Sequence, residues 1–149
     1  MYRILLDTNV LIDYFARREP YFDDVLKLRI AEAFGDVELW ACTRSFIDIL
    51  YILHNAMPRE RLVSMMLASL DFIKLSTPGG CDLSSCLENP WPDIENQMVA
   101  CGAQRVKADY LVTRNVPDFE RSAVPVRLPA QAVAELAEKG FSYAEVELG

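Results

Sequence analysis

Apolar and polar positions follow one another along the chain in two patterns. Short apolar runs predict buried strands, whereas apolar residues three and four positions apart predict amphipathic helices. The predicted strands cover 3–6, 38–42, 72–75 and 110–112, with a short fifth strand over 124–128. The predicted helices cover 9–16, 20–34, 43–53, 59–70, 92–107 and 130–139.

Strands that alternate with helices indicate an α/β fold with a mainly parallel sheet. We expect a single domain over 1–149. The fifth strand belongs at a sheet edge because prolines flank it. The segment 76–89 is predicted to be a loop with one short helix over 82–87, and the structure of the tail 141–149 is left open.

The first predicted strand ends at a carboxylate. Ile4, Leu5 and Leu6 form an apolar run typical of a strand buried on both faces, and Asp7 follows directly. Ligands of open α/β sheets bind beyond the carboxyl ends of the strands, which makes Asp7 a candidate metal ligand. A carboxylate in this place can equally be a helix N-cap, so this stretch alone leaves both roles open.

Composition restricts the class of protein. Of the 149 residues, 52% are hydrophobic and 25% are charged, as in a globular protein with a sizeable core. No apolar run reaches the roughly 18 residues that a membrane span requires. Asp7 interrupts the N-terminal apolar run, which argues against a signal peptide. We therefore expect a cytoplasmic protein.

The charge balance limits how the chain can bind nucleic acid. A net charge of −7, from 22 acidic and 15 basic residues, argues against binding over the whole surface. It leaves room for a local basic rim around an acidic centre. Three tyrosines are expected to pack in the core rather than to stack on bases, namely Tyr14, Tyr51 and Tyr110.

The four cysteines do not predict a zinc site. They lack CxxC spacing, and the only histidine, His54, has no partner at ligand spacing. Cys42 and Cys101 lie in apolar surroundings and are expected in the core. Cys81 and Cys86 fall in the segment predicted to be mostly loop.

Further polar residues follow the other predicted strands or begin the helices after them. In a parallel sheet these positions open at one edge, so we expect them near Asp7. Oxygen ligands favour Mg²⁺ or Mn²⁺ over zinc, and such a site can activate water at a phosphodiester. A separate helix cap for each acid is the alternative. The group consists of Asp48, Asp93, Asn96, Asn115 and Asp118, whereas Glu95 is expected to point elsewhere.

Four segments of the chain form a recognisable combination: LLDTNVLID at 5–13, TRSFIDILYIL at 43–53, PDIENQMVACGAQRVKADYLVTRNVPDF at 92–119 and SAVPVRLPAQAV at 122–133. Together they resemble the PIN domain family of metal-dependent nucleases, which includes the toxins of bacterial toxin–antitoxin pairs. The resemblance covers most of the chain, and LLDTN combined with VTRNVPDF is its most specific part. It implies a three-layer α/β/α fold around a mainly parallel sheet of four or five strands.

The resemblance also implies a function and a set of site residues. It implies a ribonuclease that depends on Mg²⁺ or Mn²⁺, with RNA as substrate, a cognate antitoxin as partner and a homodimer as assembly. The implied catalytic residues are Asp7, Asp48, Asp93 and Asp118. The implied metal ligands are Asp7, Asp93, Asn96, Asn115 and Asp118. The implied substrate contacts are Asn9, Arg44 and Arg114, with Arg114 as the best candidate for a phosphate contact.

Two positions depart from the family pattern. Asn96 stands where the family commonly has an aspartate that is a principal metal ligand, and Asn115 stands where many relatives have aspartate. An amide oxygen can bind a cation but does not offset its charge. A degenerate module that binds RNA or protein without cleaving is therefore an alternative function. A phosphohydrolase of the haloacid dehalogenase type is a third, although it needs a second aspartate where this chain has Asn9.

Overall fold

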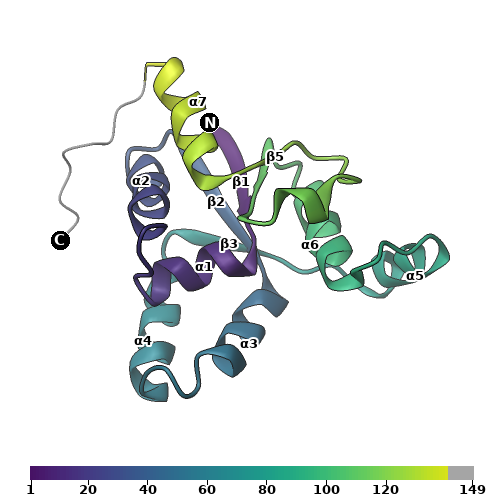
Figure 1. The fold of residues 1–149 in the computed structure, drawn as a ribbon, viewed down its shortest axis with the longest axis horizontal. Helices are drawn as coiled ribbons and strands as arrows, with labels where there is room; N and C mark the ends of the chain where they lie inside the picture. Colours follow the sequence, from purple (N-terminus) through teal and green to yellow (C-terminus); the bar gives the residue numbers. More distant parts are fainter. Residues whose placement is uncertain (141–149) are drawn as a thin grey trace.

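A parallel five-stranded sheet forms the centre of the computed structural model, which describes residues 1–140 (Figure 1). The strands are β1 (Tyr2–Leu6), β2 (Val37–Cys42), β3 (Ile73–Ser76), β4 (Tyr110–Val112) and β5 (Val126–Arg127). Their order is β3-β2-β1-β4-β5, and every neighbouring pair is parallel. The predicted α/β class and parallel sheet are confirmed. The tail 141–149 lies outside the described residues.

Helices cover both faces of this sheet. They are α1 (Thr8–Phe15), α2 (Phe22–Ala33), α3 (Thr43–Ile52), α4 (Arg59–Ser69), α5 (Gly80–Glu88), α6 (Ile94–Arg105) and α7 (Pro129–Glu138), with a 3₁₀ turn η1 (Val116–Phe119). Helices α1, α2 and α7 lie on one face, whereas α6 lies on the other with α5 beside it (Figure 1). Within residues 1–140, no helix combines the length and apolarity that crossing a membrane requires.

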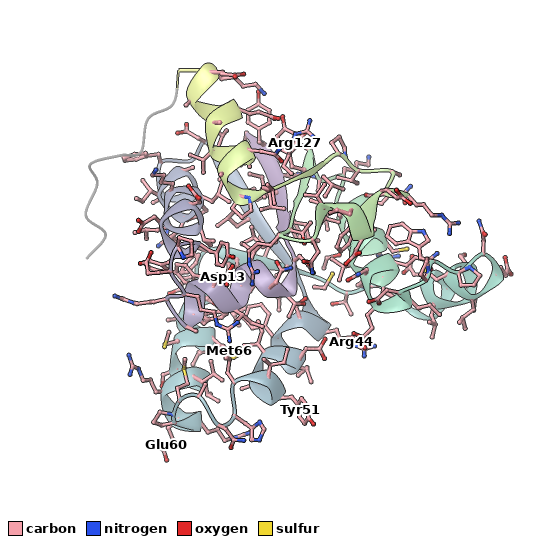
Figure 2. The ribbon with its side chains drawn as sticks, viewed as in Figure 1. Asp13, Arg44, Tyr51, Glu60, Met66 and Arg127 are labelled. Atoms are coloured by element: carbon pink, nitrogen blue, oxygen red, sulfur yellow. The ribbon has the colours of Figure 1, made fainter. Side chains whose placement is uncertain are left out.

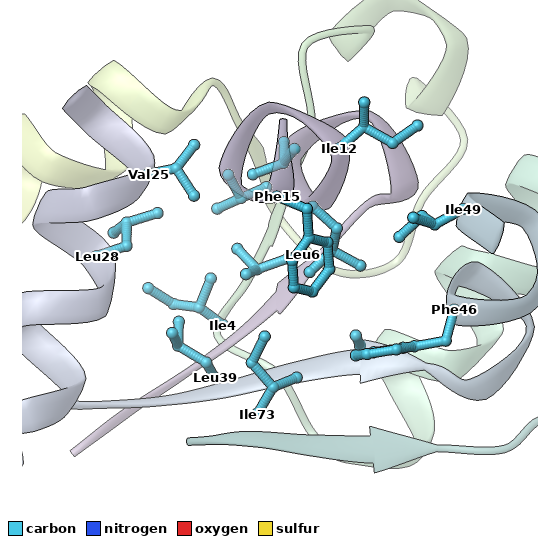
Figure 3. Packing of buried hydrophobic residues seen from close by; sticks show 14 of the residues in the cluster. Ile4, Leu6, Ile12, Phe15, Val25, Leu28, Leu39, Phe46, Ile49 and Ile73 are labelled. Atoms are coloured by element: carbon cyan, nitrogen blue, oxygen red, sulfur yellow. The ribbon is translucent and has the colours of Figure 1, made fainter. Parts of the chain in front are cut away.

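The central strand β1 packs apolar side chains on both of its faces, as its sequence predicts. Ile4 and Leu6 join Leu39 in the cluster beneath α1 and α2 (Figure 3). Leu5 points to the opposite face, where it packs with Leu111 and with alanines of α6. Each buried side chain of this size contributes roughly 1.5–3 kcal/mol. The strand that carries Asp7 is thus held rigidly from both sides.

Helix α6 begins two residues later than predicted. It starts at Ile94 rather than Pro92, because Asp93 is its N-cap. The Asp93 carboxylate accepts a hydrogen bond from the backbone N–H of Asn96 at 3.1 Å. Such a cap contributes about 1 kcal/mol to helix stability. The cap also fixes where the first turn of α6, which carries Glu95, begins.

The segment predicted to be mostly loop contains a longer helix than expected. Helix α5 covers Gly80–Glu88, whereas the prediction gave it only 82–87. Its start is stabilised by Asp82, whose carboxylate accepts a hydrogen bond from the backbone N–H of Gly79 at 2.7 Å. The helix places Cys86 in a buried position against α6 rather than in a loop.

The expectation that Tyr51 packs in the core is wrong, because its side chain is 78% exposed. Helix α3 buries the face that carries Phe46 and Ile49, and Tyr51 falls on the opposite face. Tyr14 and Tyr110 do pack partly buried against the core, as expected. The reason for the difference is that other elements cover α3 on one side alone, although its sequence is apolar around most of the helix.

Candidate active site

The candidate site lies where the strand order changes direction. The chain proceeds from β1 to β2 and β3 on one side of the sheet, then crosses to β4 and β5 on the other. Ligands of open α/β proteins bind at such a point, beyond the carboxyl ends of the strands. Leu6 and Val112 are paired in register, so the residues that follow them, Asp7 and Thr113, lie side by side.

Both carboxylate oxygens of Asp7 accept hydrogen bonds. The backbone N–H of Thr8 donates to Oδ1 at 2.8 Å, and the hydroxyl of Thr113 donates to Oδ2 at 2.8 Å. Asp7 is 5% exposed, and Thr113 is fully buried. Asp7 is therefore the N-cap of α1, and it also lines the cleft described below. The two roles that the sequence left open are compatible.

The electrostatic surroundings of Asp7 disfavour its charged form. Burial raises the pKa of the Asp7 carboxyl, and the nearby negative charge of Asp93 raises it further. The hydrogen bonds from Thr113 and Thr8 and the positive charge of Arg114 lower the pKa but do not cancel the effect of burial. A cation between Asp7 and Asp93 would relieve this repulsion.

A cleft of about 620 Å³ opens beside Asp7. The start of α1, the outer face of α3, the start of α6 and the loop after β4 form its walls. Sequence-predicted residues that line it are Asp7, Asn9, Asp48, Asn96 and Asn115. Its other lining residues are Thr8, Ile12, Ile47, Tyr51, Ile52 and Glu95.

Arg44 connects two walls of the cleft. It extends from α3, as does Tyr51 farther along the helix (Figure 2). Its guanidinium lies 3.0 Å from a carboxylate oxygen of Glu95 on α6 and 3.7 Å from one of Asp48 on α3. The expectation that Glu95 points elsewhere is wrong, since Glu95 lines the cleft, where its carboxylate forms an ion pair with Arg44.

The other two predicted acids lie in a second, smaller hollow. Asp93 and Asp118 line a space of about 240 Å³ together with Trp91 and Arg121. Asp93 also acts electrostatically on Asp7, so it belongs to the surroundings of both hollows. Asp118, on η1, comes near Asp93 but does not line the main cleft.

Arg114 has partners other than the predicted phosphate. Its Nε donates to Oδ2 of Asp13 at 2.6 Å, its Nη2 donates to Oδ1 at 3.3 Å, and Asp13 is fully buried. The guanidinium also lies 4.3 Å from the centre of the Tyr21 ring. The backbone N–H of Arg114 donates to Asn9 Oδ1 at 3.3 Å. Arg114 thus ties the loop after β4 to α1, and it does not line the cleft.

The donor set around Asp7 suits a hard divalent cation. It offers the carboxylates of Asp7 and Asp93 and the amide oxygens of Asn96 and Asn115. Within residues 1–140, no three histidine, cysteine or acidic side chains gather closely enough to hold a metal ion by themselves. Mg²⁺ commonly binds through one or two carboxylates and keeps several waters, so this sparse set of oxygens fits it.

The family follows from the sequence together with this fold. The family profile described as PIN domain matches residues 3–117. The chain belongs to the PIN domain family. PIN domain nucleases generally use divalent metals, which agrees with the oxygen donors around Asp7. No curated protein matches this PIN domain significantly.

Solved structures share the fold of this PIN domain. One is VapBC2 from Rickettsia felis bound to a promoter DNA fragment, with a TM-score of 0.63 and 15% identity over 85% of this chain and 98% of that chain. DNA-bound VapBC from Salmonella typhimurium has a TM-score of 0.63 and 16% identity over 87% and 99%. A toxin–antitoxin complex from Klebsiella pneumoniae has a TM-score of 0.59 and 19% identity over 85% and 97%. These matches confirm the α/β fold.

Sequence reasoning missed three residues of the site, namely Thr113, Glu95 and Tyr51. A signal was available for Thr113, because it directly follows β4 in the same way that Asp7 follows β1. Glu95 was expected to point away from the site and Tyr51 to pack in the core. The residues around each of them in the sequence do not show that both side chains line a cleft instead. Both positions depend on how α3 and α6 are placed relative to each other at the carboxyl edge of the sheet.

Proposed function

We propose that this PIN domain is an endoribonuclease that depends on Mg²⁺ or Mn²⁺ and acts as the toxin of a toxin–antitoxin pair. The observation that carries the proposal is the environment of Asp7. This carboxylate is buried at the switch point of the sheet, accepts hydrogen bonds from the neutral donors Thr8 and Thr113, and lines a cleft with other oxygen-bearing side chains. Membership of the PIN domain family and the fold shared with VapBC structures support it.

Every predicted site residue except Arg114, which pairs with Asp13, has a role in this proposal. Asp7 and Asp93 would hold the divalent ion, with the amide oxygens of Asn96 and Asn115 as further ligands. Asp118, which lines the second hollow with Asp93, would add its negative charge to the site. Bound Mg²⁺ or Mn²⁺ supplies positive charge at the scissile phosphodiester and activates a water. Asp48 accepts the proton of the attacking water. Arg44 turns from its two acids to an RNA phosphate, and Asn9 orients the substrate.

Cleavage of RNA by the purified chain tests the proposal. We expect cleavage of a fluorescent single-stranded RNA in Mn²⁺ and none with a chelator. Asp7→Asn should slow it at least about 100-fold, because an amide cannot offset the charge of the ion. Glu60→Gln is the control, since Glu60 is exposed on α4 and lies away from the cleft (Figure 2). Equal cleavage by wild type and Asp7→Asn would contradict the proposal.

The toxin role has its own test. The similar structure from Klebsiella pneumoniae is a toxin–antitoxin complex, and we propose a cognate antitoxin for this chain as well. Expression of the wild type should arrest growth, and co-expression of a short adjacent reading frame should relieve the arrest. If cells grow normally while the purified enzyme cleaves RNA, the chain is a nuclease but not a toxin.

The resemblance also implies a homodimer. Light scattering of the purified chain tests this assembly.

A second candidate function, binding without cleavage, rests on Asn96 and Asn115. Calorimetry distinguishes the nuclease from this non-cleaving module. Mg²⁺ binding by the wild type, abolished in Asp7→Ala, favours the nuclease. Asn96→Asp is the matched variant, and it should tighten Mg²⁺ binding roughly tenfold by adding a carboxylate. If only Asn96→Asp cleaves RNA while the wild type binds it, the non-cleaving function is correct.

A further inference from the structure

Three sulfur atoms meet between α5 and α6. The Sγ atoms of Cys86 and Cys101 lie 3.5 Å apart, and the Sγ of Cys86 lies 3.7 Å from the Sδ of Met98. Both cysteines are free thiols. The two helices run beside each other at one side of the molecule (Figure 1). None of the three residues lines the cleft or the second hollow, so the proposed nuclease site does not use them.

The two helices hold this sulfur group in place. Met98 and Cys101 are three positions apart and so share a face of α6. Cys86 lies in the last turns of α5 and is 2% exposed, whereas Met98 and Cys101 are only partly buried. An ion pair of 3.1 Å between Asp82 of α5 and Arg105 of α6 joins the same two helices. The group is therefore fixed on one side and reachable from solvent on the other.

We propose that Cys86, Cys101 and Met98 form a binding site for a thiophilic monovalent cation, with Cu(I) as the ion that fits best. Thiolate and thioether ligands are soft and suit Cu(I), zinc and iron–sulfur clusters, and of these only Cu(I) is served by two cysteines and a methionine. On binding, the ion replaces the two thiol protons, which leave to solvent, and accepts a lone pair from the thioether. No change of oxidation state is involved.

The composition of the site excludes the common alternative of zinc. Structural zinc sites have four ligands from cysteine, histidine or carboxylate. Within the described part of the chain, no third residue of these types joins the two cysteines to form a metal-binding group. The acid whose charge reaches Cys101 is Asp82, and its carboxylate is already bonded to Arg105 and to the N–H of Gly79.

Anaerobic titration of the reduced full chain with Cu(I), in competition with the chromophoric chelator bicinchoninate, tests this site. We expect one Cu(I) per chain. Cys86→Ser and Cys101→Ser should each weaken binding about 100-fold or more, and Met98→Leu about tenfold, since each removes a ligand. Cys81→Ser is the matched control, because Cys81 lies on the same helix but is exposed. It should bind as the wild type does.

Several results would overturn the proposal. They are wild-type binding too weak to compete with the chelator, binding unchanged in Cys86→Ser, and binding lost in Cys81→Ser. Met98→Leu keeps both thiols and nearly the same side-chain volume, so it remains informative if a serine variant fails to fold. X-ray absorption should show one sulfur fewer around Cu(I) in Met98→Leu. An unchanged sulfur count would remove Met98 from the site and contradict the three-sulfur proposal.

Discussion

The floor of the cleft and its rim are built in different ways. We call Asp7, which lines the cleft, and Thr113, which supports it from the buried side, the floor; they are 5% and 0% exposed and joined by a hydrogen bond of 2.8 Å. The rim consists of Arg44, Asp48 and Glu95, whose side chains are 66%, 37% and 70% exposed. The polar groups of the floor are shielded from water, whereas water solvates the charged groups of the rim.

This difference separates groups that hold a geometry from groups that can exchange partners. In the floor, a broken hydrogen bond leaves a buried charge unsatisfied, which is costly. At the rim, water screens each ion pair, so a single pair contributes about 0–1 kcal/mol. The exchange proposed above, in which Arg44 leaves Glu95 and Asp48 for a substrate phosphate, would therefore cost little, while Asp7 keeps its position.

The largest expected effect lies next to the floor, at the ion pair between the fully buried Asp13 and Arg114, which directly follows Thr113. Asp13→Ala should lower the free energy of unfolding by about 3 kcal/mol, because it leaves the Arg114 guanidinium partly buried without its partner. Urea denaturation measures this change. Asp71→Ala, at an exposed acid, is the control and should leave the midpoint nearly unchanged. A wild-type midpoint for Asp13→Ala would show that the pair is not important for stability.

A smaller loss is expected from the hydroxyl that supports Asp7. Thr113→Val keeps the shape of the side chain and removes its hydrogen bond to the carboxylate, which should cost about 1.5–2 kcal/mol. The same urea experiment applies. Thr43→Val is the matched control, because the hydroxyl of Thr43 bonds to Thr77 near the surface at 2.7 Å. An equal loss of stability in both variants would show that a hydrogen bond in the buried floor contributes no more than one near the surface.

The raised pKa of Asp7 predicts a gain in stability when its charge is removed. A carboxyl whose pKa is higher in the folded state destabilises the fold at neutral pH, and this cost disappears as pH falls through the folded-state pKa. Without divalent ions, Asp7→Asn should therefore melt a few degrees above wild type at pH 7. The difference should shrink toward pH 4. A lower melting temperature at pH 7 would contradict the sign of the shift.

The smallest effect is expected at the rim. Arg44→Met should change the free energy of unfolding by less than about 0.5 kcal/mol, because solvent already screens its two ion pairs. The same variant should weaken RNA binding and reduce its dependence on salt. Fluorescence anisotropy at several salt concentrations measures the binding. A large loss of stability would place Arg44 with the floor rather than the rim.

Much of the fold was predictable from local patterns. Ile4, Leu5 and Leu6 specify a strand buried on both faces without reference to any distant residue, and Asp7 must then lie at its end. Alternation of strands with helices was enough to predict a parallel sheet, whose carboxyl edge collects polar side chains. The amphipathic faces were less predictable, as Tyr51 shows, because an apolar position does not reveal whether another element covers it.

The sequence by itself determined which chemical groups the site has: carboxylates and amides, with no histidine or cysteine among the predicted ligands. Only the tertiary structure decided which of these groups meet. The Thr113 hydroxyl bonds to Asp7 from 106 positions away, and Glu95 reaches Arg44 across 51 positions. The sulfur group likewise joins Cys86 to Cys101 across 15 positions. Strand register and helix packing bring these pairs together, and neither is encoded in the local pattern around a single residue.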